Sequence, residues 1–579
     1  MKFSLVGDCF QKLEQTSSRT AMTELLAELF KKAAPGELSI MCNLSLGQLN
    51  PPYIGTQFNI ATALMTKVVA KLLDVSEATV AAHAKKQGDL GSVAEEGTWR
   101  TSADLTVNQV YKALHAIERL GGSGSQEEKI HQLTHLLKSL DPQSAKFVIR
   151  IILGKLRLGF SDMTIVDALS WMEAGDKSLR DDIENAYNIC ADIGLIAQTL
   201  KEGGIAAVKK MHATVGIPIR PAAAERLPTA KAIVEKLGHC IAQPKLDGFR
   251  LQIHLDKTHT YKKLHFYSRN LQDMSNMFPD LVDEIEKLDV QTLICEGEAI
   301  VYDRATGSFL PFQETVKRKR KHDIEEVAQD LPLQVFIFDV LYLNGKDLLD
   351  KTHEERRKIL LHLFKGLRTE VVQPIEEKKI TTAKELEDYF NQNIAAGLEG
   401  LVVKRPDAIY QPGKRNFNWI KLKRQEEGHL EDTIDCVILG YYAGEGKRAT
   451  FGIGAFLVGV YNKKTDRFET IAKIGTGLKD HDWVELKKKC DKIKVADKPK
   501  NVACAKDLYP DVWTSPEIVV LIRADEITMS PVHAAGKTEE TLGYALRFPR
   551  FMGYRPDKSS LEATTVDEVK GLFKDQFKK

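Results

Sequence analysis

The spacing of apolar residues changes twice along the chain, and this restricts the fold to a protein of several domains. Up to about residue 215, apolar residues recur with a helical spacing. The clearest cases are Thr23–Ala34, Phe58–Leu73, Val107–Leu120 and Phe147–Leu158. Gly216–Pro221 contains two prolines and ends the pattern. We therefore expect an all-α N-terminal domain over residues 1–215. A length of 579 residues leaves room for about three to five domains in total.

The middle of the chain mixes short β-type runs with helical segments. The β-type runs are Leu251–Leu255, Leu293–Tyr302, Leu333–Tyr342, Gly400–Lys404 and Trp419–Lys423. Pro279–Leu288 and Thr382–Gln392 have helical spacing and lie between these runs. This alternation predicts an α+β domain over residues 216–428.

Beyond residue 429 the predicted strands lie closer together, and glycine-containing turns bound several of them. The candidates are Thr433–Tyr442, Ala455–Tyr461, Arg467–Ile474 and Ile518–Ile527. This pattern predicts a small closed β structure over residues 429–579. Thr565–Phe577 is predicted to be a short basic amphipathic helix. The fold class expected for the whole chain is multidomain α+β.

Composition limits the environment and the partners of the protein. The 82 Lys and Arg residues nearly balance the 80 Asp and Glu residues, so any nucleic-acid surface must be a local basic face. The eight cysteines are isolated, which argues against a zinc ribbon and indicates reduced thiols. Met1–Phe10 does not resemble a signal peptide, and the apolar runs are too short to cross a bilayer. We expect an intracellular protein without membrane contact, cytoplasmic in a prokaryotic-type cell or nuclear in a eukaryotic or viral host.

The segment Lys245–Arg250 reads Lys-Leu-Asp-Gly-Phe-Arg and is the sharpest chemical signal in the sequence. It combines a candidate nucleophile, a carboxylate two residues later, a glycine that permits a tight turn, and an arginine. If the segment is extended, Lys245 and Asp247 point to the same face. Taken alone, a surface strand followed by a turn would be the simpler explanation.

A second basic motif lies at the end of the predicted α+β domain. In Trp419–Lys423 the alternation places Lys421 and Lys423 on one face of a strand, and Ile420 and Leu422 on the other. Two cations on one face can hold a phosphate and favour the neutral amine that a nucleophilic lysine needs. The alternative is a solvated edge strand on which lysines prevent aggregation.

Two glutamates lie beside glycines in predicted strands, and a third strand carries alternating phenylalanines. Glu298 in Glu-Gly-Glu and Glu399 in Glu-Gly-Leu-Val-Val-Lys are suited to a ribose hydroxyl or a hard divalent cation. Simple solvation of a strand edge explains either glutamate equally well. Phe336 and Phe338 alternate on one face of their strand, for which an ordinary core strand is the alternative.

Taken together, and with Arg269, these motifs occur in an order and at intervals that resemble the covalent nucleotidyltransferases, which include polynucleotide ligases and capping enzymes. Leu546–Phe551 and Arg555–Lys558 resemble the final motif of ATP-dependent DNA ligases. Val148–Asp167 resembles the helical DNA-binding domain of that family. The whole chain is thus similar to the three-domain, archaeal and eukaryotic type of ATP-dependent DNA ligase, which implies an OB-fold β-barrel as the C-terminal domain.

This resemblance implies an enzyme that seals nicks in duplex DNA during replication, repair or recombination. A lysyl-AMP would form on Lys245, AMP would move to the 5′-phosphate of the nick, and the 3′-hydroxyl would displace it. Lys421 and Lys423 would hold the α-phosphate. Glu399 would bind Mg²⁺, or Mn²⁺ in its place, and Glu298 is a second candidate metal ligand. The nucleotide-binding residues implied are Gln243, Lys245, Arg250, Arg269, Glu298, Phe338, Arg415, Lys421, Arg547 and Arg550.

Individual roles in that set follow from the same resemblance. Phe338 would stack on adenine, whereas Arg250 and Glu298 would meet the ribose. Arg547 and Arg550 would reach the pyrophosphate. Similar ligases often carry glutamate at the position of Gln243, where the side chain reads the adenine amino group. Because glutamine can accept or donate, ATP is expected, but tolerance of another nucleotide stays open.

Three other classes of protein share part of this pattern. A capping guanylyltransferase or RNA ligase is not expected to carry both the helical domain and the final arginine motif. An NAD-dependent DNA ligase would need a four-cysteine zinc site, which the isolated cysteines cannot form. A non-catalytic nick-binding protein would not need the complete lysine and glutamate set.

Partners and targeting are less well marked in the sequence. Nicked double-stranded DNA and ATP are the expected partners of a monomer, and the sequence has no clear sliding-clamp motif. The basic run Lys317–Lys321 is predicted to be a basic helix of the nucleotidyltransferase domain rather than a targeting signal.

Overall fold

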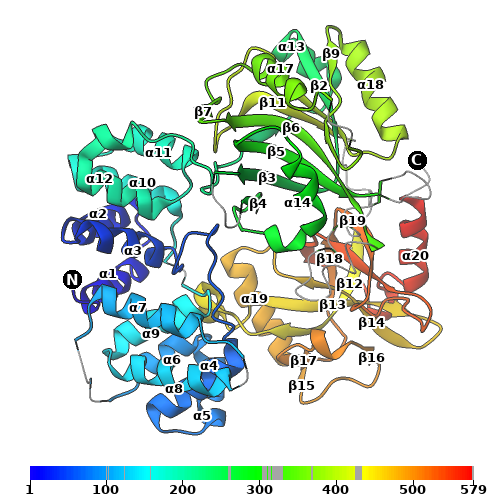
Figure 1. The fold of residues 1–579 in the computed structure, drawn as a ribbon. Helices are drawn as coiled ribbons and strands as arrows, with labels where there is room; N and C mark the ends of the chain where they lie inside the picture. Colours follow the sequence, from blue (N-terminus) through cyan, green and yellow to red (C-terminus); the bar gives the residue numbers. More distant parts are fainter. Residues whose placement is uncertain are drawn as a thin grey trace. The chain divides into compact units, whose positions relative to one another are not determined.

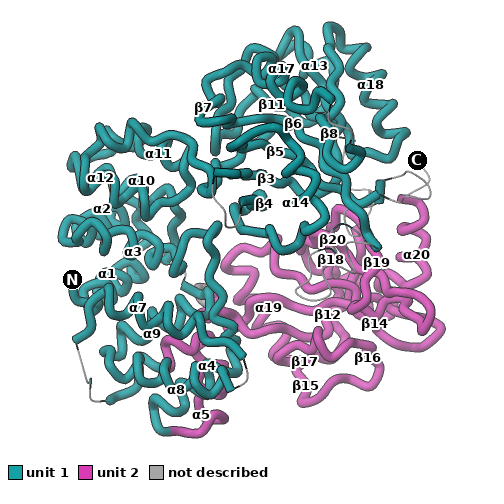
Figure 2. Tube along the Cα trace, viewed as in Figure 1, with its two compact units in different colours: residues 1–74, 94–424 teal, residues 75–93, 425–579 magenta. Residues whose placement is uncertain are grey.

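The computed structural model describes two compact units. The described residues are 1–576 apart from 100, 102–103, 123, 157, 259–262, 303–308, 311–314, 316–317, 319–329, 367–368 and 424–432. One unit contains residues 1–74 and 94–424, and the other contains residues 75–93 and 425–579 (Figure 2). The basic run Lys317–Lys321 lies outside the described residues apart from Arg318, which is buried and pairs with Asp280.

The N-terminal region is helical, as predicted (Figure 1). Its helices are α1 (Ser4–Glu14), α2 (Arg19–Lys31), α3 (Pro35–Ser45), α4 (Thr62–Leu73), α5 (Glu77–Gln87), α6 (Leu90–Glu95), α7 (Val107–Glu118), α8 (Ser125–Lys138), α9 (Pro142–Ile152), α10 (Asp162–Ala174), α11 (Arg180–Ile189) and α12 (Ile193–Val208). Within the described parts of the chain, no helix is long and apolar enough to span a membrane.

Helix α9 shows why one predicted helix is too long. It begins where the Asp141 carboxylate accepts a hydrogen bond from the Ser144 N–H at 2.9 Å and Pro142 occupies the first turn. The prediction extended this helix to Leu158, but the helix ends at Ile152. Gly154 then adopts a φ of 63°, a left-handed conformation that stops helix propagation.

The central region contains two β-sheets, as the alternating pattern predicts. A five-stranded sheet has the order β1 (Ala223–Arg226), β11 (Arg415–Lys423), β10 (Gly400–Lys404), β2 (Cys240–Lys245) and β9 (Lys378–Ile380). A six-stranded sheet has the order β4 (Leu264–Ser268), β3 (Phe249–Asp256), β5 (Thr292–Val301), β6 (Leu333–Leu343) and β7 (Lys346–Asp347), and β8 (Val372–Pro374) pairs with β6. The helices of this region are α13 (Ala230–Leu237), α14 (Pro279–Glu286), α17 (His353–Leu363) and α18 (Ala383–Ala395), with a 3₁₀ turn at Ser275–Met277.

Each central sheet buries one face against helices. In the smaller sheet, Leu401, Ile420 and Leu422 pack in one core with Ile233 of α13 and Leu386 of α18. The opposite face of β11 therefore presents Lys421 and Lys423, as the alternation predicts. In the larger sheet, the second core joins β3, β5 and β6 to α14. The faces that remain are available to form a binding site.

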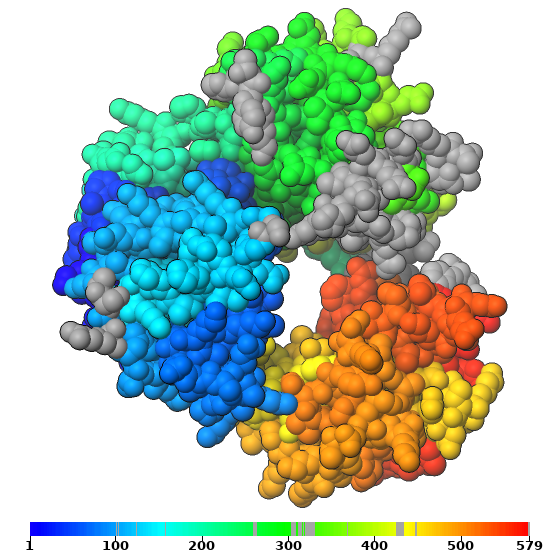
Figure 3. Space-filling view, turned by 60° about the horizontal axis from the view of Figure 1, so that its bottom comes forward, coloured from blue at the N-terminus to red at the C-terminus, as the bar shows by residue number. Residues whose placement is uncertain are grey.

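The C-terminal region is rich in β-strands (Figure 1), and its surface appears in yellow to red in Figure 3. Its main sheet joins β12 (Ile434–Tyr442), β13 (Ala455–Asn462), β14 (Arg467–Ile474), β15 (Lys494–Val495), β16 (Val502–Ala503), β17 (Val512–Thr514), β18 (Val519–Arg523) and β21 (Arg550–Tyr554). A separate hairpin joins β19 (Glu526–Ser530) and β20 (Gly543–Arg547). The helices are α19 (Asp480–Lys492) and α20 (Val566–Asp575), with 3₁₀ turns at Gly446–Phe451, Lys506–Leu508 and Ser560–Glu562.

One predicted strand of this region is in fact two. Ile518–Ile527 divides into β18 and β19, which belong to different sheets. The chain breaks at Ala524 and Asp525, where the Asp525 N–H donates to the Arg547 carbonyl at 3.0 Å. The charged residues Arg523, Asp525 and Glu526 mark the break, but periodicity does not show which partner a strand will pair with. The fold class itself, with a helical N-terminal region, a central α+β domain and a β-rich C-terminal region, is confirmed.

Candidate active site

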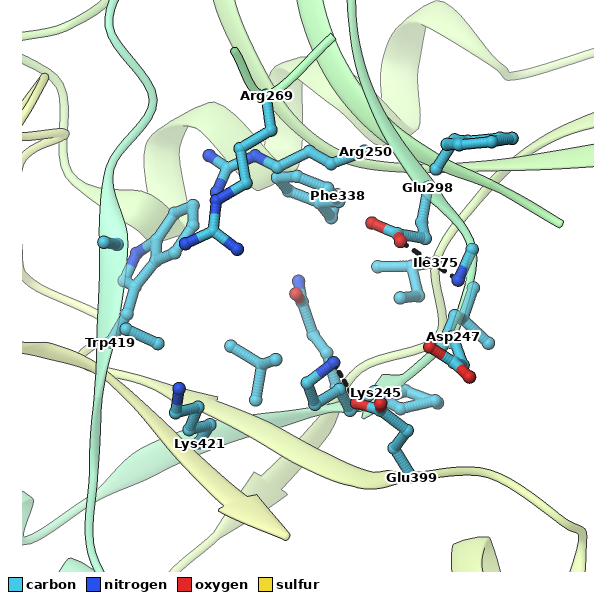
Figure 4. Close-up of a pocket in the computed structure, with 18 of the residues that line it drawn as sticks. Lys245, Asp247, Arg250, Arg269, Glu298, Phe338, Ile375, Glu399, Trp419 and Lys421 are labelled. Atoms are coloured by element: carbon cyan, nitrogen blue, oxygen red, sulfur yellow. Dashed lines mark hydrogen bonds and ion pairs between the residues drawn. The ribbon is translucent and has the colours of Figure 1, made fainter. Parts of the chain in front are cut away.

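A cavity of about 540 Å³ lies between the two sheets of the central region (Figure 4). It brings together most of the predicted site residues: Gln243, Lys245, Asp247, Arg250, Arg269, Glu298, Phe338, Glu399, Arg415, Lys421 and Lys423 all line it. Arg269 and Arg415 are exposed at the wall of the cavity. Figure 4 shows Lys245, Asp247, Glu399 and Lys421 toward one end, with Arg250, Arg269 and Phe338 toward the other.

Strand register explains how residues far apart in sequence meet at one end of this cavity. Gly400 of β10 pairs with Lys245 of β2 on one side and with Lys423 of β11 on the other. Two residues along, Val402 pairs with Gln243 and Lys421 in the same way. Because side chains two residues apart point to the same face, four polar side chains form two rows across the sheet. A β-carbon at Gly400, whose φ is 140°, would lie 2.2 Å from the Leu422 carbonyl oxygen.

At the end of the cavity that contains Lys245, Glu399 pairs with two lysines. Its carboxylate forms an ion pair with Lys245 and a second one with Lys423 at 3.1 Å. Burial raises the pKa of Glu399, but the two ammonium groups outweigh that effect and leave the pKa below its usual value. The same cluster acts oppositely on Asp247, whose pKa is raised by burial and by the neighbouring Glu399 charge. One carboxylate is thus firmly ionised and its neighbour accepts a proton more readily.

Lys421 itself experiences burial and like-charge repulsion. Burial first, and then the positive charges of Lys423 and Arg415, lower the pKa of Lys421 below its usual value. This end of the cavity therefore brings Lys245, Lys421 and Lys423 together with the carboxylates of Asp247, Glu298 and Glu399. The lysines of such a site can bind a polyanion, for example the phosphates of a nucleotide.

Gly248 and Glu298 form the opposite rim of the same end. The Gly248 N–H donates to the Glu298 carboxylate at 3.2 Å. A β-carbon at residue 248 would lie 2.2 Å from the Ala299 carbonyl oxygen, so only glycine allows this approach. Burial raises the pKa of Glu298 from 4.5 to about 7, although Lys245 and Arg250 oppose the shift. Glu298 therefore titrates in the neutral pH range.

Arg250 is held inside the protein rather than left free at the cavity wall. Its guanidinium donates to both oxygens of the buried Glu296, at 2.8 and 3.0 Å, and to the Ala222 carbonyl at 2.7 Å. The Tyr410 hydroxyl also donates to Glu296 at 2.8 Å. The guanidinium carbon of Arg250 lies 5.4 Å from the centroid of the Phe338 ring. Arg250 thus supports the aromatic wall of the cavity.

That wall also contains Lys404 and Trp419, which were not predicted from the sequence as site residues. The Lys404 ammonium lies 4.2 Å from the centroid of a Trp419 ring and 5.0 Å from that of Phe338, and it donates to the Phe338 carbonyl at 3.2 Å. Burial lowers the pKa of Lys404 to about 8, despite nearby Asp339 and Glu377. Both residues lie within motifs already noted, since Lys404 ends Glu-Gly-Leu-Val-Val-Lys and Trp419 begins the lysine strand.

Glu377, which sequence reasoning also missed, contacts Gln243 from behind the cavity. The Gln243 amide nitrogen donates to Glu377 at 2.6 Å, and His353 Nε2 lies 2.9 Å from the same oxygen. Arg357 lies 3.3 Å from the second oxygen of Glu377. Glu377 belongs to the charged run Glu376–Lys379, which carries no signal that distinguishes it from a solvated loop.

Arg547 and Arg550 lie in the C-terminal unit and do not line the cavity. Both are exposed. Arg547 on β20 pairs with Glu526, and Arg550 on β21 lies 3.3 Å from Asp525. Among the described residues, no group of three or more His, Cys, Asp or Glu side chains has the arrangement of a metal site.

Three family models match successive parts of the chain. "DNA ligase N terminus" matches residues 2–170, "ATP dependent DNA ligase domain" matches residues 221–423, and "ATP dependent DNA ligase C terminal region" matches residues 449–558. The second match contains every residue that lines the cavity.

Curated relatives match the chain from end to end. A "Probable DNA ligase" of Dictyoglomus turgidum is 46% identical over 582 residues, which cover 100% of this chain and 98% of the relative. "DNA ligase 2" of Thermofilum pendens is 39% identical over 598 residues, with the same coverage of 100% and 98%. A solved structure named "Pmar-Lig_Pre" is 17% identical, with a TM-score of 0.56 over 95% of this chain and 99% of its own. That structural likeness concerns the fold alone.

Proposed function

Because the chain belongs to the family of ATP-dependent DNA ligases, we propose that it seals nicks in duplex DNA through a covalent AMP adduct on Lys245. Members of this family use ATP. The observation that carries the proposal is the convergence of Lys245, Glu399, Lys421 and Lys423 on one cavity from three neighbouring strands. Lys245 pairs with Glu399, which also pairs with Lys423, so the candidate nucleophile lies beside a second lysine of the cavity.

Lys245 is the proposed nucleophile in three successive displacements at phosphorus. Its neutral amine attacks the α-phosphorus of ATP, a P–N bond forms, and the bond to the β-phosphate breaks to release pyrophosphate. The AMP group then passes to the 5′-phosphate of a nick, and the 3′-hydroxyl displaces AMP to form the phosphodiester. Before the first step Lys245 must lose a proton, for which Glu399 is the nearest carboxylate and Asp247 the more basic neighbour.

Lys421 and Lys423 would bind the α-phosphate on the same face of the sheet as Lys245. They neutralise charge that develops on the equatorial oxygens during each displacement, which is how positioned cations accelerate phosphoryl transfer. This role needs no movement of the strand, since β10 and β11 already set the lysines in register. The strand therefore acts as a rigid support for the reacting phosphate.

The carboxylates of the cavity fit a hard divalent cation such as Mg²⁺. Asp247 and Glu399 lie close enough for the charge of one to raise the pKa of the other, a repulsion that a cation would relieve. Two carboxylates together with nucleotide oxygens and water form a donor set that Mg²⁺ favours. Glu399 of this pair is the proposed ligand, and Glu298 across the cavity is a second candidate. The ion would supply further charge neutralisation at the phosphates, and Mn²⁺ could take its place.

The other end of the cavity is proposed to hold the nucleoside. Phe338 offers a ring face for stacking on adenine, supported from behind by Arg250 and Lys404. Gln243 would accept from the adenine amino group, while Glu298 and Arg250 would lie near the ribose. Arg269 and Arg415 are proposed to contact the nucleotide from the exposed wall, and Arg547 and Arg550 to bind the pyrophosphate.

The domain boundaries at residues 215 and 428 are also part of the proposal. Helix α12 ends at Val208 and β1 begins at Ala223, whereas β11 ends at Lys423 and β12 begins at Ile434. The first boundary thus falls between a helix and a strand, and the second between strands of two different sheets. We propose that the protein is a monomer and acts on nicked duplex DNA, and that the N-terminal helices contact phosphates, so that affinity falls steeply with salt.

Labelling with α-³²P-ATP and Mg²⁺, followed by a denaturing gel, tests this function. An acid-labile label on the protein, discharged by nicked duplex DNA with joining of the strands, is the expected result. Pretreatment with pyrophosphate removes any AMP already bound. Absence of label after that treatment, or a label that nicked DNA does not discharge, would contradict the proposal.

A further inference from the structure

Gln243 is an ambiguous reader of a base, because its amide can present either an acceptor or a donor to the cavity. Only its orientation decides which group faces a bound purine. Adenine offers a 6-amino donor at the edge where guanine offers a 6-keto acceptor. An amide that rotated freely would bind both bases with similar strength. Selection of ATP therefore needs a neighbouring group that fixes the orientation of the amide.

Glu377 supplies a chemical reason for one orientation. Its carboxylate oxygen lies 2.6 Å from the Gln243 amide nitrogen. A carboxylate can only accept, so the NH₂ group must face Glu377 and the carbonyl oxygen must point away from it. Gln243 is buried, with 2% of its surface exposed, and it lines the cavity. No described residue donates to its carbonyl oxygen, which leaves that oxygen for a ligand.

Glu377 is itself held in place and kept ionised. His353 lies 2.9 Å from one carboxylate oxygen and Arg357 lies 3.3 Å from the other. Burial alone would raise the pKa of Glu377, but His353 and Arg357 reverse the effect and lower it. Arg357 is anchored in turn by donating to the Ile375 carbonyl at 2.6 Å, and Ile375 lines the cavity.

We infer that Glu377 is a positioning residue that selects adenine over guanine by locking the Gln243 amide with its carbonyl toward the base. This inference rests on the proposed function, since it concerns the nucleotide that reacts with Lys245. Adenine then donates its 6-amino group to the Gln243 carbonyl. Guanine places its 6-keto oxygen against the same carbonyl, and two acceptors that face each other in a buried site are strongly disfavoured.

The variant Glu377→Gln tests this lock with little change in shape. A glutamine at residue 377 can accept from the Gln243 amide or donate to its carbonyl, so neither orientation is enforced. We expect the ratio of kcat/KM for α-³²P-ATP over α-³²P-GTP in self-labelling to fall about tenfold, through a higher KM for ATP and a lower KM for GTP. The exposed neighbour Glu376 gives a matched control, because Glu376→Gln should leave the ratio unchanged.

Exchange of the two residues supplies the rescue. In Gln243→Glu with Glu377→Gln, residue 243 can only accept, and residue 377 donates to it from behind. We expect this double variant to regain selectivity for ATP, which a merely structural role of Glu377 would not predict. Should Glu377→Gln fail to fold, as judged by its melting transition, the double variant still decides the matter, and loss of ATP selectivity in it overturns the inference.

The outcomes separate this inference from the proposed function. Equal loss of labelling with ATP and GTP in Glu377→Gln, or an unchanged ratio, overturns the role of Glu377 but leaves Lys245 chemistry intact. Failure of the unaltered protein to accept label from either nucleotide, after pyrophosphate treatment, instead contradicts the proposed function. A reduced ratio that the exchange restores supports the lock.

Discussion

The two ends of the central cavity treat charge in opposite ways. At the reactive end, Lys245, Glu399 and Lys423 have side chains 20–25% exposed, and one carboxylate serves two ammonium groups. At the base end, arginines and carboxylates form buried pairs, as in Arg250 with Glu296 and Arg356 with Asp339, where both side chains of the latter pair are 1% exposed. The reactive end can therefore exchange partners when a ligand enters, whereas the base end is a fixed frame.

This contrast separates the two costs of substitution. When a shared, partly hydrated charge is removed, its neighbours keep another partner or contact water. The free energy of unfolding therefore changes little, whereas the reaction slows. Removal of one member of a buried pair leaves an uncompensated charge, which costs about 3–5 kcal/mol. Variants at the reactive end should thus affect activity alone, and variants in the frame should affect folding first.

Lys245→Ala should show the largest effect on activity and almost none on stability. Without the amine no P–N bond can form, so we expect self-labelling with α-³²P-ATP to be lost completely. Glu399 keeps Lys423 as a partner at 3.1 Å, so the free energy of unfolding and the affinity for nicked duplex DNA should stay close to those of the unaltered protein. Label on this variant would show that another residue is the nucleophile.

Arg356→Met tests the opposite end, with a large effect on stability. The Arg356 guanidinium donates to both oxygens of Asp339, at 2.7 and 3.1 Å, and this pair lowers the pKa of Asp339 far below its usual value against the effect of burial. We expect the free energy of unfolding to fall by about 3–5 kcal/mol in a denaturant titration. The exposed pair Lys384 and Asp388 provides the control.

In that control, Lys384→Met should leave the free energy of unfolding nearly unchanged, because both side chains of the pair are largely hydrated. Equal costs for the two variants would show that the base end is not a fixed frame. If Lys245→Ala lowered the free energy of unfolding by several kcal/mol, the reactive end would be part of the rigid frame as well, and the proposed difference between the two ends would be wrong.

The sequence revealed much of the reactive end but little of the frame. Alternation in Trp419–Lys423 correctly placed both lysines on the face opposite Ile420 and Leu422, because a strand's side-chain period is fixed by local geometry. The contact between Gln243 and Glu377 spans 134 residues and depends on how β2 meets a loop, which no local pattern encodes. The pairing of Arg356 with Asp339 was unpredictable for the same reason.

Element ends show the same limit in the other regions. The helix predicted over Phe147–Leu158 stops at Ile152, because the left-handed Gly154 follows it. Ile518–Ile527 separates into two strands because each half pairs with a different partner. Periodicity identifies the type of an element, but tertiary pairing decides where it ends.

Lys423→Ala should give an intermediate effect confined to chemistry. The loss of one cation from the proposed phosphate site is expected to slow self-labelling by about 10²–10³-fold, the usual effect of removing one group that stabilises developing charge. The melting transition should stay unchanged, and Lys379→Ala, an exposed lysine on β9 of the same sheet, should alter neither property. Collapse of the melting transition in Lys423→Ala would assign this lysine to the frame instead.

Glu298→Gln gives the smallest effect and locates the border between the two ends. Burial raises the pKa of Glu298 from 4.5 to about 7, so the folded protein binds more protons than the unfolded chain between these values. Stability therefore decreases as the pH rises through this window, and the variant, which has no such group, does not share that loss. Relative to the unaltered protein, its Tm should be equal near pH 4.5 and higher by about 2–4 °C at pH 8. A Tm difference that does not depend on pH would show that Glu298 is hydrated, as the side chains of the reactive end are. Glu296 would then be the first carboxylate of the buried frame.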